Sequence, residues 1–232
     1  AGEQGVWYDP SDLSSMFQDA AGTIPVTGVE QPVGRVLDKS GRGNHATQAT
    51  TTKRPMLSAR VNQALSTEKL SLTPWSFLSG TTVSENSTLG PDGVTLAGKV
   101  IAGTTAGNQG ARQVILTAAS QQYAVKFKFK AADYTKISIA DAAFSRFSLV
   151  YDTITGATTY TNGLGYVSSS FSLLSNGWFQ GTVLFSASTV AYIQITGTPD
   201  STALPSGASF TGDGVSGIYV SEISFTPADQ SS

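Results

Sequence analysis

The chain has 232 residues, of which 40% are hydrophobic and 13% charged; serine and threonine, at 30 and 28, make up one quarter of it. This length and apolar content suffice to bury a core, and the few charges favour a binding or structural β-protein. A net charge of -2 without a basic block argues against nucleic-acid binding, the absence of cysteine excludes disulfides and thiolate zinc sites, and no apolar run approaches the roughly 18 residues that cross a membrane.

Residues 7–19, WYDPSDLSSMFQD, are predicted to form the one helix of the chain. Asp9 suits the N-cap and Pro10 the first helical position. The apolar side chains that follow at helical spacing are Leu13, Met16 and Phe17.

From residue 20 to residue 72 the sequence is rich in Gly, Pro, Thr and Gln and has only brief apolar pieces. This texture predicts an extended arm that forms few strands of its own and lies over another surface. We therefore predict an N-terminal arm over 1–73, a folded domain over 74–229 and a disordered tail over 230–232.

Short apolar runs separated by turn signals follow residue 74, at the spacing expected of a β-sandwich or barrel. In residues 123–130, YAVKFKFK, an aromatic residue or valine alternates with lysine or alanine. This period of two predicts a strand with one face toward the core and the other toward solvent. The further predicted strands are 111–117, 136–140, 145–151, 157–161, 166–173, 178–185, 189–196 and 217–225. About ten strands with no helical periodicity between them predict an all-β fold, an antiparallel jelly-roll sandwich.

The opening WYDPSDLSSMFQDAAGTIPVT, with QPVGRVLDKSGRGNHATQATTTKRPML after it, resembles a leader of bacteriophage virion proteins of the tail-fibre, head-fibre and head-decoration kinds. The later pieces LGPDGVTLAGKV, LSNGWFQGTV and FTGDGVSGIYVSEISF resemble β-sandwich modules that are similar to carbohydrate-binding modules. The resemblance implies a phage structural protein on the exterior of the virion. The sequence holds no coiled-coil or β-helical shaft, which favours a capsid decoration or cement protein over a complete tail fibre.

The first functional hypothesis is therefore a non-catalytic decoration protein that binds the major capsid protein or other virion proteins as a homo-oligomer, preferably a trimer. A glycan-binding tail-fibre or head-fibre appendage that attaches to host surface glycan is the alternative. A polysaccharide depolymerase is the second alternative. No enzyme activity, nucleic-acid partner or membrane insertion is expected.

Five apolar side chains of the leader are expected to contact a partner, because no full domain surrounds them in the predicted arm: Trp7, Tyr8, Leu13, Met16 and Phe17. The partner surface is either the chain's own sandwich or a neighbouring subunit.

Glycan binding requires exposed aromatic rings, since the apolar faces of sugars stack on them. The rings available in the sandwich are Trp75, Tyr160, Tyr166, Trp178 and Tyr219. Tyr160 and Tyr166 flank a predicted hairpin turn and are the preferred contacts. Trp178 begins an apolar strand and is interpreted as a core residue.

Gly41 to Ala46 matches the dinucleotide pattern G-x-G-x-x-A, but the polar sequence after it predicts no helix to hold a pyrophosphate, so the segment is interpreted as a turn. His45, the one histidine of the chain, has no evident acid or serine partner in sequence and is interpreted as a loop residue bonded to backbone.

A depolymerase would need two carboxyl groups about 5 to 9.5 Å apart. The acids considered are Asp133, Asp141, Asp152, Asp213 and Glu222. Asp152 and Asp213 lie in turn sequence, where the side chain serves its own backbone. No cofactor is expected; Asp213 is the one candidate for a calcium ligand, because loop oxygens bind calcium in jelly rolls of this kind.

Overall fold

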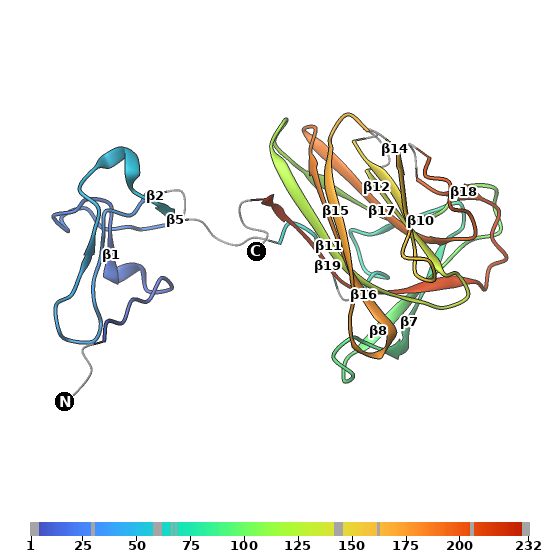
Figure 1. Cartoon of the computed structure of the whole chain (residues 1–232), viewed down its shortest axis with the longest axis horizontal. Helices are drawn as coiled ribbons and strands as arrows, with labels where there is room; N and C mark the ends of the chain where they lie inside the picture. Colours follow the sequence, from blue (N-terminus) through green and yellow to red (C-terminus); the bar gives the residue numbers. More distant parts are fainter. Residues whose placement is uncertain are drawn as a thin grey trace. The chain divides into compact units, whose positions relative to one another are not determined.

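The computed structural model describes residues 5–28, 31–57, 62–65, 67, 69–141, 146–161, 163–204 and 207–228. The chain divides into two compact units, an N-terminal unit over residues 1–60 and a sandwich unit over residues 61–232 (Figure 1). Among the described residues no helix is long and apolar enough to span a membrane.

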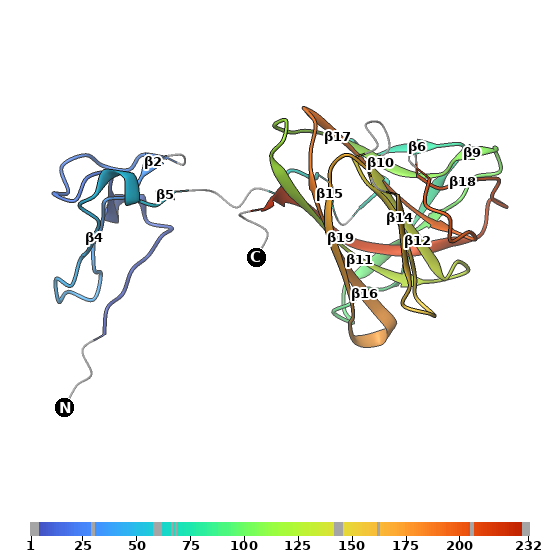
Figure 2. The same cartoon turned by 45° about the horizontal axis from the view of Figure 1, so that its top comes forward.

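Two six-stranded antiparallel sheets form the sandwich unit (Figure 2). The first, called the β11 sheet, has the spatial order β15 (Tyr166–Leu173), β16 (Trp178–Ser186), β11 (Gln122–Ala131), β19 (Gly217–Pro227), β8 (Leu96–Ile101) and β7 (Thr82–Leu89). The second, called the β12 sheet, has the order β14 (Thr158–Thr161), β13 (Ser148–Asp152), β12 (Lys136–Asp141), β17 (Val190–Thr198), β10 (Gly110–Leu116) and β6 (Ser76–Leu78). A small ribbon joins β9 (Gly107–Asn108) to β18 (Ser209–Phe210), and a 3-10 turn covers Ser175–Gly177.

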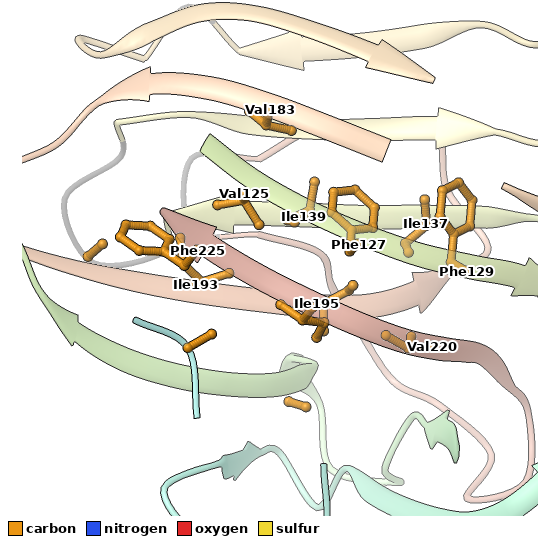
Figure 3. Close-up of a cluster of buried hydrophobic side chains, with 14 of the residues drawn as sticks. Val125, Phe127, Phe129, Ile137, Ile139, Val183, Ile193, Ile195, Val220 and Phe225 are labelled. Atoms are coloured by element: carbon orange, nitrogen blue, oxygen red, sulfur yellow. The ribbon is translucent and has the colours of Figure 1, made fainter. Parts of the chain in front are cut away.

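The core lies between the sheets and follows the alternation predicted for β11 (Figure 3). Val125, Phe127 and Phe129 are fully buried, whereas the lysines between them are half-buried on the opposite face. The β12 sheet contributes the facing isoleucines Ile137, Ile139, Ile193 and Ile195. Aromatic stacking adds to this packing, with the rings of Tyr151 and Phe171 centred 4.1 Å apart.

The all-β antiparallel jelly-roll prediction is confirmed, and nine predicted strands coincide with β10 to β17 and β19 to within a few residues. Strands β6, β7 and β8 were missed. The sequence of β7, TVSENSTL, is polar because β7 is an edge strand, and its pairing with β8 is interrupted by a bulge between Ser84 and Thr88.

The N-terminal unit has its own small sheets and its own core. Strands β1 (Met16–Phe17), β3 (Arg35–Val36) and β4 (Ala46–Thr47) form one sheet, and β2 (Gln31–Pro32) pairs with β5 (Met56–Leu57). Two 3-10 turns cover Leu13–Ser15 and Thr51–Lys53. Met16, Val26 and Val33 are buried together, with Val36 and Leu57 packed against them. A compact unit therefore replaces the extended arm that the sequence predicted.

The predicted helix over residues 7–19 is wrong. Only the 3-10 turn Leu13–Ser15 forms, and Asp12 rather than Asp9 accepts the capping hydrogen bond, from the backbone N–H of Ser14. Met16 has extended backbone because it pairs with Val36 and is buried in the small core. Tertiary pairing has overridden a local helical pattern.

The structure divides the chain after residue 60, whereas the sequence analysis placed the boundary after residue 73. The intervening segment is bound to the sandwich. The N–H of Gln63 donates to the carbonyl of Phe225 at 2.8 Å, Asn62 Oδ1 accepts from the N–H of Phe225, and Leu65 N–H donates to Gln113 Oε1. The predicted tail over 230–232 lies outside the described residues.

Replacing Phe127 with Ala should lower the free energy of unfolding by about 3–5 kcal/mol, because a fully buried ring is lost from the centre of the core. Denaturant unfolding measures this loss. Lys126→Ala, on the opposite face of the same strand, is the control and should change stability by less than about 0.5 kcal/mol. Equal effects of the two substitutions would contradict the assigned faces.

A chain beginning at residue 61 should be more stable than one beginning at residue 74. The shorter chain loses the buried side chains Ala64 and Leu70, and the indole of Trp75 loses its acceptor, the carbonyl of Leu65. We expect its melting temperature to be roughly 5–10 °C lower, by calorimetry. Identical melting temperatures would place residues 61–73 outside the sandwich.

Candidate functional site

The outer face of the β11 sheet carries a row of side chains that strand register places side by side. Lys130 on β11 is directly opposite Trp178 on β16 and Tyr219 on β19, and Tyr219 is opposite Lys99 on β8. Directly opposed residues project from the same face of a sheet. This row therefore runs across four strands on the solvent side.

A hollow of about 450 Å³ opens at one end of this row, beside Lys130. Its lining combines a hydroxyl, an amide, an ammonium group and an exposed apolar side chain: Thr88, Leu89, Gly90, Gly93, Lys130 and Asn176. The volume lies within the roughly 300–1,000 Å³ of small-ligand sites.

Trp178 fixes the turn that borders the hollow. Its side chain is fully buried, although it lies on the outer face of the sheet and not among the residues of the core between the sheets. The indole N–H donates to the carbonyl of Leu89 at 3.1 Å, and the hydroxyl of Ser175 donates to the carbonyl of Pro91 at 3.3 Å. The turn between β7 and β8 is thereby held over the sheet. Burial of Trp178 agrees with the sequence interpretation, but its location differs.

Asn176 and Gly177 form the turn between β15 and β16, and both have positive φ, 58° and 74°. A Cβ at Gly93 would lie 3.7 Å from Nδ2 of Asn176, so the Asn176 amide reaches the β7–β8 turn across the hollow. A Cβ at Gly177 would lie 3.7 Å from Cε of Lys130. Two turns and one strand thus bring their side chains to a single place.

Ion pairs neutralise some of the lysines on this face but not all of them. Lys99 Nζ lies 2.6 Å from the carboxylate of Asp133, and Lys128 pairs with Glu222. Within the part of the chain that the structure describes, Lys126 and Lys130 have no ion-pair partner. The hollow therefore contains one uncompensated ammonium group.

A smaller hollow of about 90 Å³ lies on the other side of the same turn and is lined by Asp92, Thr95, Leu96, Ser221 and Glu222. Backbone N–H groups of Val94 and Thr95 donate to the carboxylate of Asp92 and lower its pKa. These hydrogen bonds hold the Asp92 carboxylate in its own turn, and Glu222, the second acid of this hollow, is in the ion pair with Lys128.

The acids considered from the sequence each have a structural partner. Asp133 and Glu222 are in the ion pairs described above, Asp141 accepts from the N–H of Tyr192, and Asp152 accepts from the N–H of Ile154. These contacts stabilise turns and strand pairing.

Asp213 serves its own turn. Its carboxylate accepts hydrogen bonds from the hydroxyl and N–H of Ser216 and from the N–H of Val215, which lower its pKa to about 2. Among the described residues no group of three or more His, Cys, Asp or Glu side chains is placed to hold a metal ion.

In the N-terminal unit, Asp38 organises the residues of the leader. Its carboxylate accepts from the backbone N–H groups of Trp7, Ser40 and Asn44, and the first of these is the largest cause of its strongly lowered pKa. Lys39 Nζ pairs with Asp9 at 3.2 Å and lies 5.0 Å from the centre of the Trp7 ring. The order of polar residues in the leader is therefore explained by hydrogen bonds and ion pairs that stabilise this unit.

The leader side chains predicted as contacts separate into two groups. Met16 is buried in the small core and Phe17 is half-buried on β1. Trp7, Tyr8 and Leu13 remain exposed at 56%, 37% and 37%, and the hydroxyl of Tyr8 donates to the carbonyl of Asn44.

The segment 41–46 forms a turn, as predicted, with Gly41 and Gly43 at positive φ and a strand rather than a helix after it. The loop interpretation of His45 is also confirmed, because its Nδ1 accepts from the backbone N–H of Asp38 at 3.0 Å.

Of the two preferred rings, Tyr166 does not line the hollow: it packs against the core, and its hydroxyl lies 3.0 Å from that of Ser169. The side chain of Tyr160 is outside the described part of the chain. Trp75 is buried in the core. Tyr219, half-buried beside Lys130, is the ring that the structure leaves at the site.

Sequence reasoning missed most of the hollow. The alternation in β11 predicted that Lys130 faces solvent, but neither Lys130 nor Asn176 was recognised as a site residue. Nothing in the sequence indicated Leu89 and Gly90 as site residues, because strand β7, after which the turn begins, was not predicted.

No protein-family model matches the chain, and no curated protein matches it either. One similar solved structure is the xylan-binding domain CBM22-1 from Paenibacillus barcinonensis, with 11% identity and a TM-score of 0.37 over 73% of this chain and 97% of that domain. Another is a putative sugar binding protein from Bacteroides thetaiotaomicron, with 13% identity and a TM-score of 0.36 over 73% of this chain and 95% of that one. The likeness is too weak to carry residues or ligands across, and the fold assignment rests on the strand order.

Replacing Asp213 with Ala should destabilise the protein only where the carboxylate is ionised. The folded pKa of about 2 lies below the ordinary 3.8, so the contribution is complete above about pH 4 and disappears as the pH falls through 2. Melting temperatures of the two proteins, measured from pH 7 to pH 2, should therefore converge at low pH. A difference that stays constant over this range would show that the turn does not depend on the charge.

Proposed function

We propose that the protein is a non-catalytic glycan-binding module and that the hollow beside Lys130 on the outer face of the β11 sheet is its binding site. The observation that carries this proposal is the convergence of Asn176, Lys130 and the β7–β8 turn on one hollow of about 450 Å³. Its donors and its apolar wall suit a ligand that has hydroxyl groups on its edges and C–H groups on its faces.

The adjoining surface supports an extended ligand. Lys130 is followed across the sheet by Tyr219, whose ring is half-buried and offers a face for stacking. Along the neighbouring strands the outward side chains include four hydroxyls and one amide: Ser170, Ser172, Thr182, Ser224 and Gln180. Short polar side chains of this kind hydrogen-bond sugar hydroxyls without the desolvation cost of ion pairs.

We propose for the N-terminal unit a role in attachment to a larger assembly. The exposed apolar side chains of this 60-residue unit include Val6, Trp7, Ile24 and Met56, each more than half exposed. Apolar side chains exposed to this extent on a unit with so small a core are candidates for contact with another surface. The virion exterior, the capsid partner and the homo-oligomer stay proposals that rest on the leader resemblance.

Replacing Asn176 with Gly should lower affinity for a bound glycan roughly 5- to 10-fold, the effect of one lost hydrogen bond. Glycine adopts the positive φ of this position without strain, so the turn is kept. Asn86→Gly is the matched control, because Asn86 is also exposed at positive φ, 55°, but does not line the hollow.

The measurement is a glycan array of neutral and acidic oligosaccharides, followed by titration calorimetry with the ligands found. Unchanged affinity in Asn176→Gly, or equal losses in both variants, would remove the hollow as the binding site. Absence of binding to any glycan would overturn the proposed function.

A further inference from the structure

We infer that the hollow recognises an acidic sugar and that Lys130 binds its carboxylate. This inference rests on the proposed function and names its ligand class. A site built from hydroxyls and amides alone would accept neutral glycans; the uncompensated ammonium group of Lys130 makes this hollow selective for a negative charge.

Among the described residues no acid neutralises the ammonium group of Lys130, because the neighbouring acids have other partners. Glu222 is paired with Lys128, and Asp133 is paired with Lys99. Asp92 belongs to the turn above, but its carboxylate is turned toward the amides of Val94 and Thr95. None of these acids lines the larger hollow, whose one charged lining residue is Lys130.

The position of Lys130 also fits the role. Trp178 is opposite it on one side and is covered by the β7–β8 turn, and Tyr219 is opposite it on the other. A Cβ at Gly177 would lie 3.7 Å from Cε of Lys130, so the aliphatic part of this lysine packs beside the β15–β16 turn. A side chain that is already restricted by packing loses less conformational entropy when it binds an anion.

Lys126 provides a matched control for simple attraction of polyanions. It projects from the same face of the same strand, has no ion-pair partner among the described residues, and is four residues, roughly 13 Å, from Lys130. It does not line the hollow. If lysines merely attract negative polymers, both positions matter equally; if the hollow binds a carboxylate, only Lys130 matters.

The experiment compares polygalacturonate and polysialate with the same two polymers after reduction of their carboxyl groups to neutral alcohols. Together with the acidic oligosaccharides of a glycan array, these probes separate uronate from sialate sources. Each is titrated into the full chain and into Lys130→Gln, Lys130→Arg, Lys126→Gln and Asn176→Gly. Lys130 is on the surface face, so its substitution should leave the melting temperature unchanged within about 2 °C.

We expect binding of at least one carboxylated glycan, loss of that binding on carboxyl reduction, and a roughly 10- to 100-fold weaker affinity in Lys130→Gln, as expected for a lost charge-assisted hydrogen bond. Lys126→Gln should change the affinity by less than about 2-fold, and Lys130→Arg should retain most of it.

Neutral-glycan binding that Asn176→Gly weakens and Lys130→Gln does not would overturn the acidic-sugar inference and leave the proposed function standing. Equal losses in Lys126→Gln and Lys130→Gln would also overturn it, in favour of general attraction by the face. Failure of every glycan to bind would overturn both.

Discussion

The alternation of side chains along β11 is the constraint on which both faces of the sandwich unit depend. The same period of two that sends Phe127 and Phe129 into the core sends Lys128 and Lys130 to the outer face. A slip of one residue in the register would exchange these sets and bury the ammonium groups. The hydrophobic packing between the sheets therefore fixes the chemistry of the outer surface as well.

The N-terminal unit shows how a recognisable sequence motif can have a structural explanation. Asp38 and Lys39 bind backbone and side chains of the opening residues, and Met16 fills the small core. The order of these residues in the sequence is thus accounted for largely by the folding of the unit. Some side chains of the opening segment stay exposed, above all Trp7 at 56%, and these are the ones for which we propose a contact outside the unit.

Sequence reasoning succeeded where one periodic signal dominates and failed where distant residues meet. Strand β15 was predicted with its observed bounds, Tyr166–Leu173, because turn signals separate this run from its neighbours in the sequence. The helix predicted over residues 7–19 does not form, because Met16 pairs with Val36 in a sheet. The spacing of nearby apolar residues cannot reveal this pairing. Leu89, Lys130 and Asn176 meet at the hollow, although 41 positions separate the first two and 46 the last two. A local sequence pattern gives no sign of a contact between residues so far apart in the chain.

The hydrogen bond from Trp178 to the carbonyl of Leu89 fastens a surface turn from beneath, on the side of the sheet that faces away from the core. A wall held in this way is already ordered before any ligand arrives, so little conformational freedom remains to be lost on association. For the proposed glycan ligand, this means that the wall formed by the β7–β8 turn would be in place before binding, and that binding would depend on the fit to this preformed surface.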